Sequence, residues 1–133
     1  MNFLFLILMF SATGNEVQVQ HAAETVAKLH DTMLDPASFV LDSAFVTKPD
    51  KHGNVSYCYA FRSHNRMGGY SDARAVEDGG DHGRLSVYNQ DDGAGRFQGY
   101  DVGWVAPCKN KNLDRDLTEE VAALAKTLYR KDR

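Results

Sequence analysis

The stretch from Val55 to His64 has the clearest strand pattern in this chain, and it restricts the folds open to the sequence. Its odd positions carry bulky side chains, whereas its even positions carry small ones that become basic at one end. The bulky set is Val55, Tyr57, Tyr59 and Phe61, and the small set is Ser56, Cys58, Ala60, Arg62 and His64. A strand with one large and one small face suits a central position in a sheet. We expect a disulfide partner or a helix to pack on the small face.

The chain contains two cysteines, Cys58 and Cys108. In an oxidising compartment, two cysteines in a small domain most simply pair. The loop that they would close has about fifty residues, for which the chain-entropy model gives roughly 4 kcal/mol of stabilisation. A metal site needs more thiolates, and no histidine lies at close ligand spacing to either cysteine. The sequence therefore predicts a disulfide, and a free catalytic thiol is the alternative that the even count opposes.

The N-terminal segment differs in kind from the rest of the chain. An uninterrupted apolar run at residues 3–10 is followed by Ser11, Ala12, Thr13 and Gly14, in the small-residue spacing that signal peptidase accepts. The run is shorter than the about 20 residues that span a bilayer. No Lys or Arg precedes it, and a buried N-terminal strand is the alternative. We predict a signal peptide over residues 1–14, a periplasmic or secreted location, and no stable membrane anchor after cleavage.

The remaining residues, 15–133, read as a single α+β domain. Apolar residues recur at helical spacing over residues 15–34 and again from Leu113 to Leu128. Strand patterns cover residues 38–47, 55–64, 70–77 and 84–89, and a helical turn fits Phe97 to Cys108. This order predicts an N-terminal helix, a four-stranded, meander-like antiparallel sheet, and a C-terminal helix packed on the sheet.

Composition and motifs exclude several classes of function. A formal net charge of −3 lacks the basic footprint of a nucleic-acid-binding protein. The acidic turns around Asp81 and Asp91 lack the ligand spacing of a calcium loop, and the glycines at 93–99 lack the spacing of a dinucleotide fingerprint. No nucleophile or zinc-protease motif is present. We therefore expect no metal, no cofactor and no nucleic-acid partner, and the chain reads more as a binding protein than as an enzyme.

One basic cluster is a candidate ligand-binding site. Arg62 and His64 share a strand face, Arg66 follows in the loop, and Arg74 returns on the next strand. The full candidate set is Arg62, His64, Asn65, Arg66, Gly68, Gly69, Tyr70 and Arg74. Two glycines can turn backbone N–H groups toward an anion, and arginine forks can add bidentate contacts. The predicted role is an exported binding or accessory module that docks a protein partner or a small anionic group here.

Four alternatives stay open at this cluster. The arginines can be ordinary surface charges that pair with Asp72, Glu77 or Asp78, beside glycines that only reverse the chain. Tyr57 and Tyr70, if exposed, can mark a protein-binding surface, because tyrosine and arginine are common interface anchors. A small secreted hydrolase would instead use His64 with a nearby acid, and a purely structural accessory protein would use neither.

The sequence from residue 58 to residue 70, CYAFRSHNRMGGY, resembles a family of small exported bacterial proteins of unknown function. Members have a helix, an aspartate-proline-x-serine-phenylalanine stretch, and a cysteine-bearing strand that ends in N-x-x-GGY. The matching positions are Asp35 to Phe39, Cys58, Asn65 to Tyr70, Trp104 and Cys108. The resemblance covers most of the chain after residue 14. It implies export and one compact domain, and it implies no activity.

Overall fold

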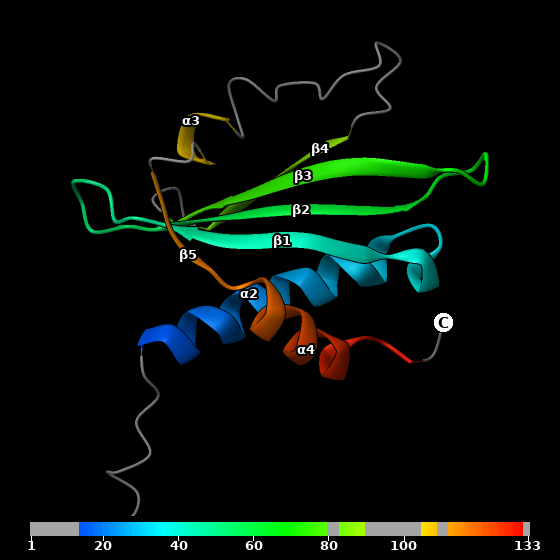
Figure 1. Ribbon diagram of the computed structural model, residues 1–133, viewed down its shortest axis with the longest axis horizontal. Helices are drawn as coiled ribbons and strands as arrows, with labels where there is room; N and C mark the ends of the chain where they lie inside the picture. Colours follow the sequence, from blue (N-terminus) through cyan, green and yellow to red (C-terminus); the bar gives the residue numbers. More distant parts are fainter. Residues whose placement is uncertain (1–13, 80–82, 90–104, 109–111, 132–133) are drawn as a thin grey trace, which may run out of the picture.

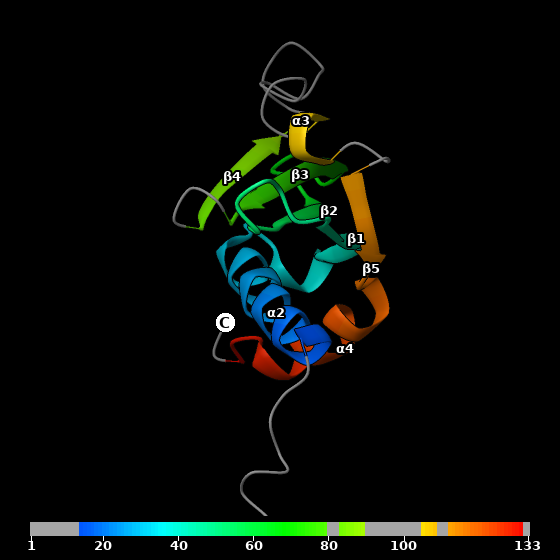
Figure 2. The same ribbon diagram turned by 90° about the vertical axis from the view of Figure 1, so that its left-hand side faces the viewer.

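The computed structural model describes residues 14–79, 83–89, 105–108 and 112–131. Two helices, α2 (Gly14–Thr32) and α4 (Thr118–Leu128), lie on one side of an antiparallel sheet (Figures 1 and 2). The strands are β1 (Val40–Thr47), β2 (Ser56–His64), β3 (Tyr70–Asp78), β4 (Arg84–Asn89) and β5 (Leu113–Asp116). Their spatial order is β4-β3-β2-β1-β5. The predicted α+β class is confirmed, with five strands where the sequence indicated four.

Strand β2 is the middle strand, and its two faces serve different purposes. The bulky face packs against the helices, and Tyr59 and Phe61 are almost completely buried there. Tyr57 on the same face is only 8% exposed, so the expectation that it lies on the surface is wrong. Tyr57 belongs to the same bulky set as Tyr59 and Phe61, and it lies in the same core.

Helices α2 and α4 pack against each other and cover the bulky face of the sheet (Figure 2). Ala22, Val26 and Leu29 of α2 recur at the spacing that keeps apolar side chains on one helix face. Val121 of α4 is fully buried in the same core. Removing one such valine from water stabilises the fold by roughly 1.5–3 kcal/mol, so the helices and sheet depend on one shared core.

Strand β5 corrects the predicted start of the C-terminal helix. Leu113 and Leu117 are four residues apart, a spacing typical of one helix face, yet they belong to cores on opposite sides of the sheet. Residues 113–116 instead pair with β1, and the helix begins at Thr118. Asp116 Oδ1 accepts the backbone N–H of Thr118 at 2.9 Å, which satisfies a donor that the first helical turn leaves open.

The segment between α2 and β1 also differs from the prediction. A short 3-10 helix, η1 (Pro36–Ser38), precedes β1, which begins at Val40. The backbone N–H and the hydroxyl of Ser38 both donate to the carbonyl oxygen of Asp35, at 3.0 and 2.7 Å. Because these two bonds close a turn, Ser38 cannot start the strand.

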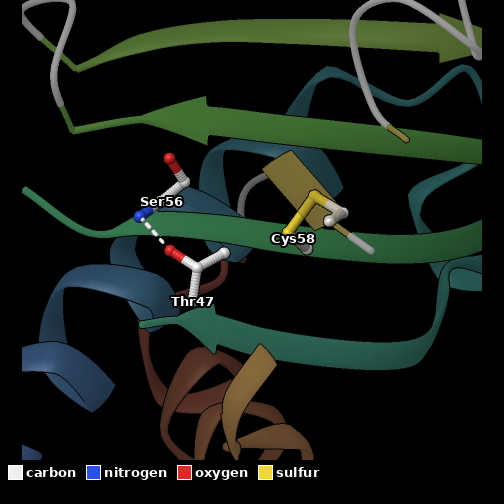
Figure 3. Close-up of a disulfide and its surroundings, with 4 residues drawn as sticks. Thr47, Ser56 and Cys58 are labelled. Carbon is white, nitrogen blue, oxygen red and sulfur yellow. Dashed lines mark hydrogen bonds between the residues drawn. A yellow bond between two sulfur atoms is a disulfide. The ribbon is translucent and has the colours of Figure 1, made fainter. Parts of the chain in front are cut away.

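The predicted disulfide is confirmed between Cys58 and Cys108, whose Cα atoms lie 6.0 Å apart. It joins the small face of β2 to α3 (Val105–Cys108), which lies on the side of the sheet away from α2 and α4 (Figures 1 and 3). Val76 packs beside it in a second, smaller apolar cluster. Figure 3 also shows Ser56 at the start of β2, whose N–H donates to Thr47 Oγ1 at 2.8 Å.

Several predicted features lie outside the described residues. They are the apolar run and most of the predicted signal peptide, both acidic loops around Asp81 and Asp91, and Phe97 to Trp104 of the predicted helical turn. The last four residues of that turn form α3, which is helical. Within the described ranges, no helix is both long enough and apolar enough to cross a bilayer.

Candidate functional site

The β2–β3 hairpin carries all eight residues predicted for the binding site. Asn65 organises its turn: the backbone N–H of Met67 donates to Asn65 Oδ1 at 2.9 Å, and that of Gly68 donates to Asn65 O at 3.1 Å. Gly68 has a φ of 86°, which favours glycine, and the backbone N–H of Asn65 closes the turn on Gly69 O at 2.8 Å. The N–H groups of Met67 and Gly68 therefore donate within the hairpin. Fewer backbone N–H groups are open to an anion than the sequence suggested.

Arg62 is engaged by acidic and aromatic neighbours on the sheet face away from the helices. Its Nε donates to Asp42 Oδ1 at 3.1 Å, and the hydrogen bond and charge of Asp42 raise the pKa of Arg62. Asp42 lies at a bulge of β1, where the pairing with β2 shifts by one residue. The guanidinium carbon also lies 5.4 Å from the ring centroid of Tyr70. Arg62 thus has a carboxylate partner already.

His64 contacts the other side of the predicted cluster. Its ring centroid lies 4.3 Å from that of Tyr70, the residue opposite it in the β2–β3 ladder. Its Nδ1 lies 3.2 Å from Asp35 Oδ2, so the nearby acid is Asp35. The backbone N–H of His64 donates to Ser38 Oγ at 2.8 Å, and the Ser38 hydroxyl donates to Asp35 O at 2.7 Å. This hydroxyl fastens η1 to β2.

The outer part of the hairpin is exposed. Met67 is 92% exposed and Tyr70 is 51% exposed, and Arg66 stands beside Met67 in the turn. We call the surface formed by Arg62, Arg66, Met67 and Tyr70 the hairpin-tip surface. The structure therefore brings Arg62, His64 and Tyr70 together. Arg74 lies two ladder positions further from the tip, opposite Ala60, where its Nη1 donates to Ala73 O at 3.3 Å.

A second polar cluster, between α2 and the sheet, was not predicted. Its centre is Glu77 of β3, which is only 8% exposed although it is acidic. Glu77 Oε1 lies 2.8 Å from His21 Nε2 and accepts hydrogen bonds from Thr25 at 3.1 Å and Tyr59 at 3.3 Å. The Thr25 hydroxyl also lies 3.2 Å from Oε2. We call these four residues the Glu77 cluster.

The Glu77 cluster perturbs the tyrosines around it. Burial, reinforced by the negative charge of Glu77, raises the pKa of Tyr59 far above that of a free phenol. The same two causes raise the pKa of Tyr57, whose ring lies 4.9 Å from that of His21. Both phenols are therefore neutral at physiological pH.

The alternation of β3 and the helical spacing of α2 both point to the Glu77 cluster. Glu77 shares the parity of Ala73 and Ala75, which face the helices, and His21 and Thr25 lie one turn apart on α2. The sequence reading treated Glu77 only as a surface partner for the arginines. Among the described residues, no group of three or more His, Cys, Asp or Glu side chains could hold a metal ion.

Comparisons with protein-family models, with curated proteins and with solved structures found no match for this chain. The resemblance to a family of small exported proteins therefore remains a prediction. The geometry of the two sites is therefore the feature that bears on function.

Proposed function

We propose that this protein is an exported binding module that docks a protein partner through the hairpin-tip surface. The observation that carries the proposal is the exposed ring of Tyr70, which contacts His64 and lies near the Arg62 guanidinium. An aromatic side chain that is ordered before binding loses little conformational entropy in a complex. Tyrosine, arginine and methionine are also enriched at the centres of protein interfaces.

A protein partner fits this surface better than a small anion. Arg62 already has a carboxylate partner in Asp42, and the N–H groups of Met67 and Gly68 donate inside the turn. A free anion would have to displace these contacts. A protein surface can instead cover Met67 and Tyr70, whose exposed area is largely apolar or aromatic, and leave the ion pair at the rim.

Export is part of the same proposal. The buried disulfide supports it, because such bonds persist mainly in oxidising compartments. The apolar run at residues 3–10, with small residues after it, supports a cleaved leader. Expression of the full chain in a bacterial host, followed by mass measurement of the periplasmic protein, tests this step. A mature chain that begins near Asn15 is expected, and a full-length protein retained in the cytoplasm would contradict it.

Site-specific photocrosslinking tests the docking surface. A photoreactive amino acid replaces Met67 at the hairpin tip, and in a control protein it replaces Lys51, which is exposed in the β1–β2 loop at the opposite end of the sheet. In cells that express the protein natively, we expect one defined adduct from position 67 and none of that mass from position 51. Adding Tyr70→Ala should abolish the adduct. Equal adducts from both positions, or adducts that survive Tyr70→Ala, would contradict the proposal.

The contact of His64 with Asp35 favours a hydrolase as the second candidate, because a carboxylate can orient an imidazole as a general base. A screen of ester, amide and phosphoester substrates tests it. Turnover that is lost in His64→Ala, while the melting temperature is kept, would replace the binding proposal.

A further inference from the structure

A pocket of about 420 Å³ opens between the N-terminal half of α2 and the ends of β2 and β3. It lies at the opposite end of the sheet from the hairpin-tip surface, because the β1–β2 loop and the end of β3 border it. Its described lining includes Val17, His21, Asn54, Val55, Tyr57 and Glu77. The pocket therefore has aliphatic and aromatic walls and contains the carboxylate of the Glu77 cluster, the usual composition of a small-ligand site.

Few cationic groups lie near the carboxylate of Glu77 among the described residues. Thr25 and Tyr59 give it neutral hydrogen bonds, and among the described residues only the His21 imidazole lies within ion-pair distance. His21 keeps 44% of its side-chain exposure and is charged only when protonated. A buried carboxylate is costly unless a cation neutralises it. When His21 is neutral, the cluster has an unneutralised negative charge that lines an accessible pocket.

The surroundings of the pocket also favour a cation. A neighbouring depression shares Val17 and His21 with it and is lined by Glu16 and Glu24 of α2. The ring of Tyr57 offers an aromatic wall, which attracts cations. Arg115, whose charge acts on Tyr57, is engaged with Asn15 and Asp114. The charges next to the entrance on α2 are therefore acidic.

The geometry points to a binding site for a small aliphatic ammonium ion in this pocket. The ammonium group donates to the carboxylate of Glu77, and the aliphatic chain packs on Val17, Val55 and the Tyr57 ring. A metal ion fits less well, because the described residues provide no third protein ligand. An anion would meet Glu77 directly.

A titration followed by nuclear magnetic resonance tests the site. The probes are n-butylammonium, n-butanol and butyrate, which share an alkyl chain and differ in charge, added to the purified protein at pH 8. We expect saturable shifts of the His21 and Tyr57 ring signals with n-butylammonium. Its affinity should exceed that of n-butanol by at least about tenfold, the ratio that corresponds to one charge-assisted hydrogen bond. Equal affinities, or no saturable shift at His21, would overturn the proposal.

Substitutions separate Glu77 from the general acidity of α2. Glu77→Gln keeps the shape and should weaken n-butylammonium binding by at least about tenfold, whereas Glu24→Gln removes a charge of the neighbouring depression and should weaken it by less than about threefold. Equal losses in the two variants would assign binding to the overall field and overturn the site.

His21→Gln provides a second variant in case Glu77→Gln does not fold. It removes the imidazole but keeps a hydrogen-bond donor for Glu77, so the preference for the amine over n-butanol should remain. Loss of that preference would show that His21, and not Glu77, recognises the probe, and would overturn the proposal. None of these outcomes depends on the hairpin-tip surface, so the two sites can fail independently.

Discussion

The imidazole of His30 lies flat on the ring of Tyr129, with centroids 3.5 Å apart and ring planes within 2° of parallel. The contact joins the end of α2 to the residue that follows α4. Next to the stack, Asp31 Oδ1 lies 2.8 Å from His30 Nδ1 and accepts the backbone N–H of Arg130 at 3.1 Å. Tyr129 and Arg130, which follow α4, are thus held to α2 by an aromatic contact and a shared carboxylate.

This contact predicts that Tyr129→Ala lowers the free energy of unfolding by about 2 kcal/mol, because it removes an aromatic pair worth roughly 0.5–1.5 kcal/mol together with half-buried apolar area. Tyr129→Phe keeps the stack and should change the free energy of unfolding by less than about 0.5 kcal/mol. Urea unfolding measures both. An alanine variant as stable as the original would show that the end of α4 does not pack on α2 in solution.

Loss of the disulfide should lower the free energy of unfolding by more than Tyr129→Ala does. The double variant Cys58→Ala/Cys108→Ala removes a crosslink across a sequence separation of 50 residues and should lower the free energy of unfolding by roughly 2–5 kcal/mol. Thiol labelling of the unfolded, unreduced protein should find no free cysteine. Labelling of both cysteines in that sample would contradict the assigned bond.

The hydroxyl of Thr25 should matter more than its size. Thr25→Val keeps the shape but leaves the buried carboxylate of Glu77 with one donor fewer, which should cost about 1–3 kcal/mol. Thr25→Ser keeps the donor and serves as the matched control. If valine proves no worse than serine, the hydroxyl does not stabilise the carboxylate.

Alkaline pH should unfold the protein through its buried tyrosines. Burial raises the pKa values of Tyr57, Tyr59 and Tyr129 above the value of about 10 in an unfolded chain. A raised folded-state pKa leaves the stabilisation intact below about pH 10, and the stabilisation is lost as the pH rises from there toward the folded-state value. Phenolate absorbance should therefore show that some of the six tyrosines ionise only together with unfolding. Ionisation of all six in one phase near pH 10, before any loss of circular dichroism, would contradict this.

The close approach of Gly79 to Val55, the residue before β2, predicts an asymmetry between two glycines. A Cβ on Gly79 would clash with the carbonyl oxygen of Val55, whereas one on Gly69 would meet nothing within 4 Å. Gly79→Ala should therefore cost about 1–3 kcal/mol through forced backbone movement, and Gly69→Ala less than about 1 kcal/mol. Melting temperatures of the two variants decide between them, and equal values would argue against the close approach.

The sequence predicted the features that depend on local periodicity and on cysteine count. The two faces of β2, the strand pairs that follow one another in the chain, and the disulfide were all predictable. Strand β5 was not, because Leu113 and Leu117 mimic a helical repeat while they face different cores. The switch depends on pairing with β1, more than sixty positions away in the chain, and no local pattern encodes that pairing.

For the candidate sites, too, local contacts were predictable and contacts between distant elements were not. Arg62, His64 and Tyr70 of the predicted set do lie together, because a hairpin is a local structure, whereas Arg74 lies further from the tip. Their partners Asp42 and Asp35 come from other elements and change what the arginine and histidine can bind. The Glu77 cluster was missed for the same reason, since His21 and Glu77 meet only after α2 has packed on the sheet.

The position of β5 beside β1 has a consequence for a chain that emerges residue by residue. Strands β1 to β4 can pair in the order of their synthesis, but the outer edge of β1 and the exposed flank of α2 stay open until residues 113–128 arrive. Until then the nascent protein lacks one side of its core. Closure of the core therefore waits for residues 113–128, the last of its elements to leave the ribosome.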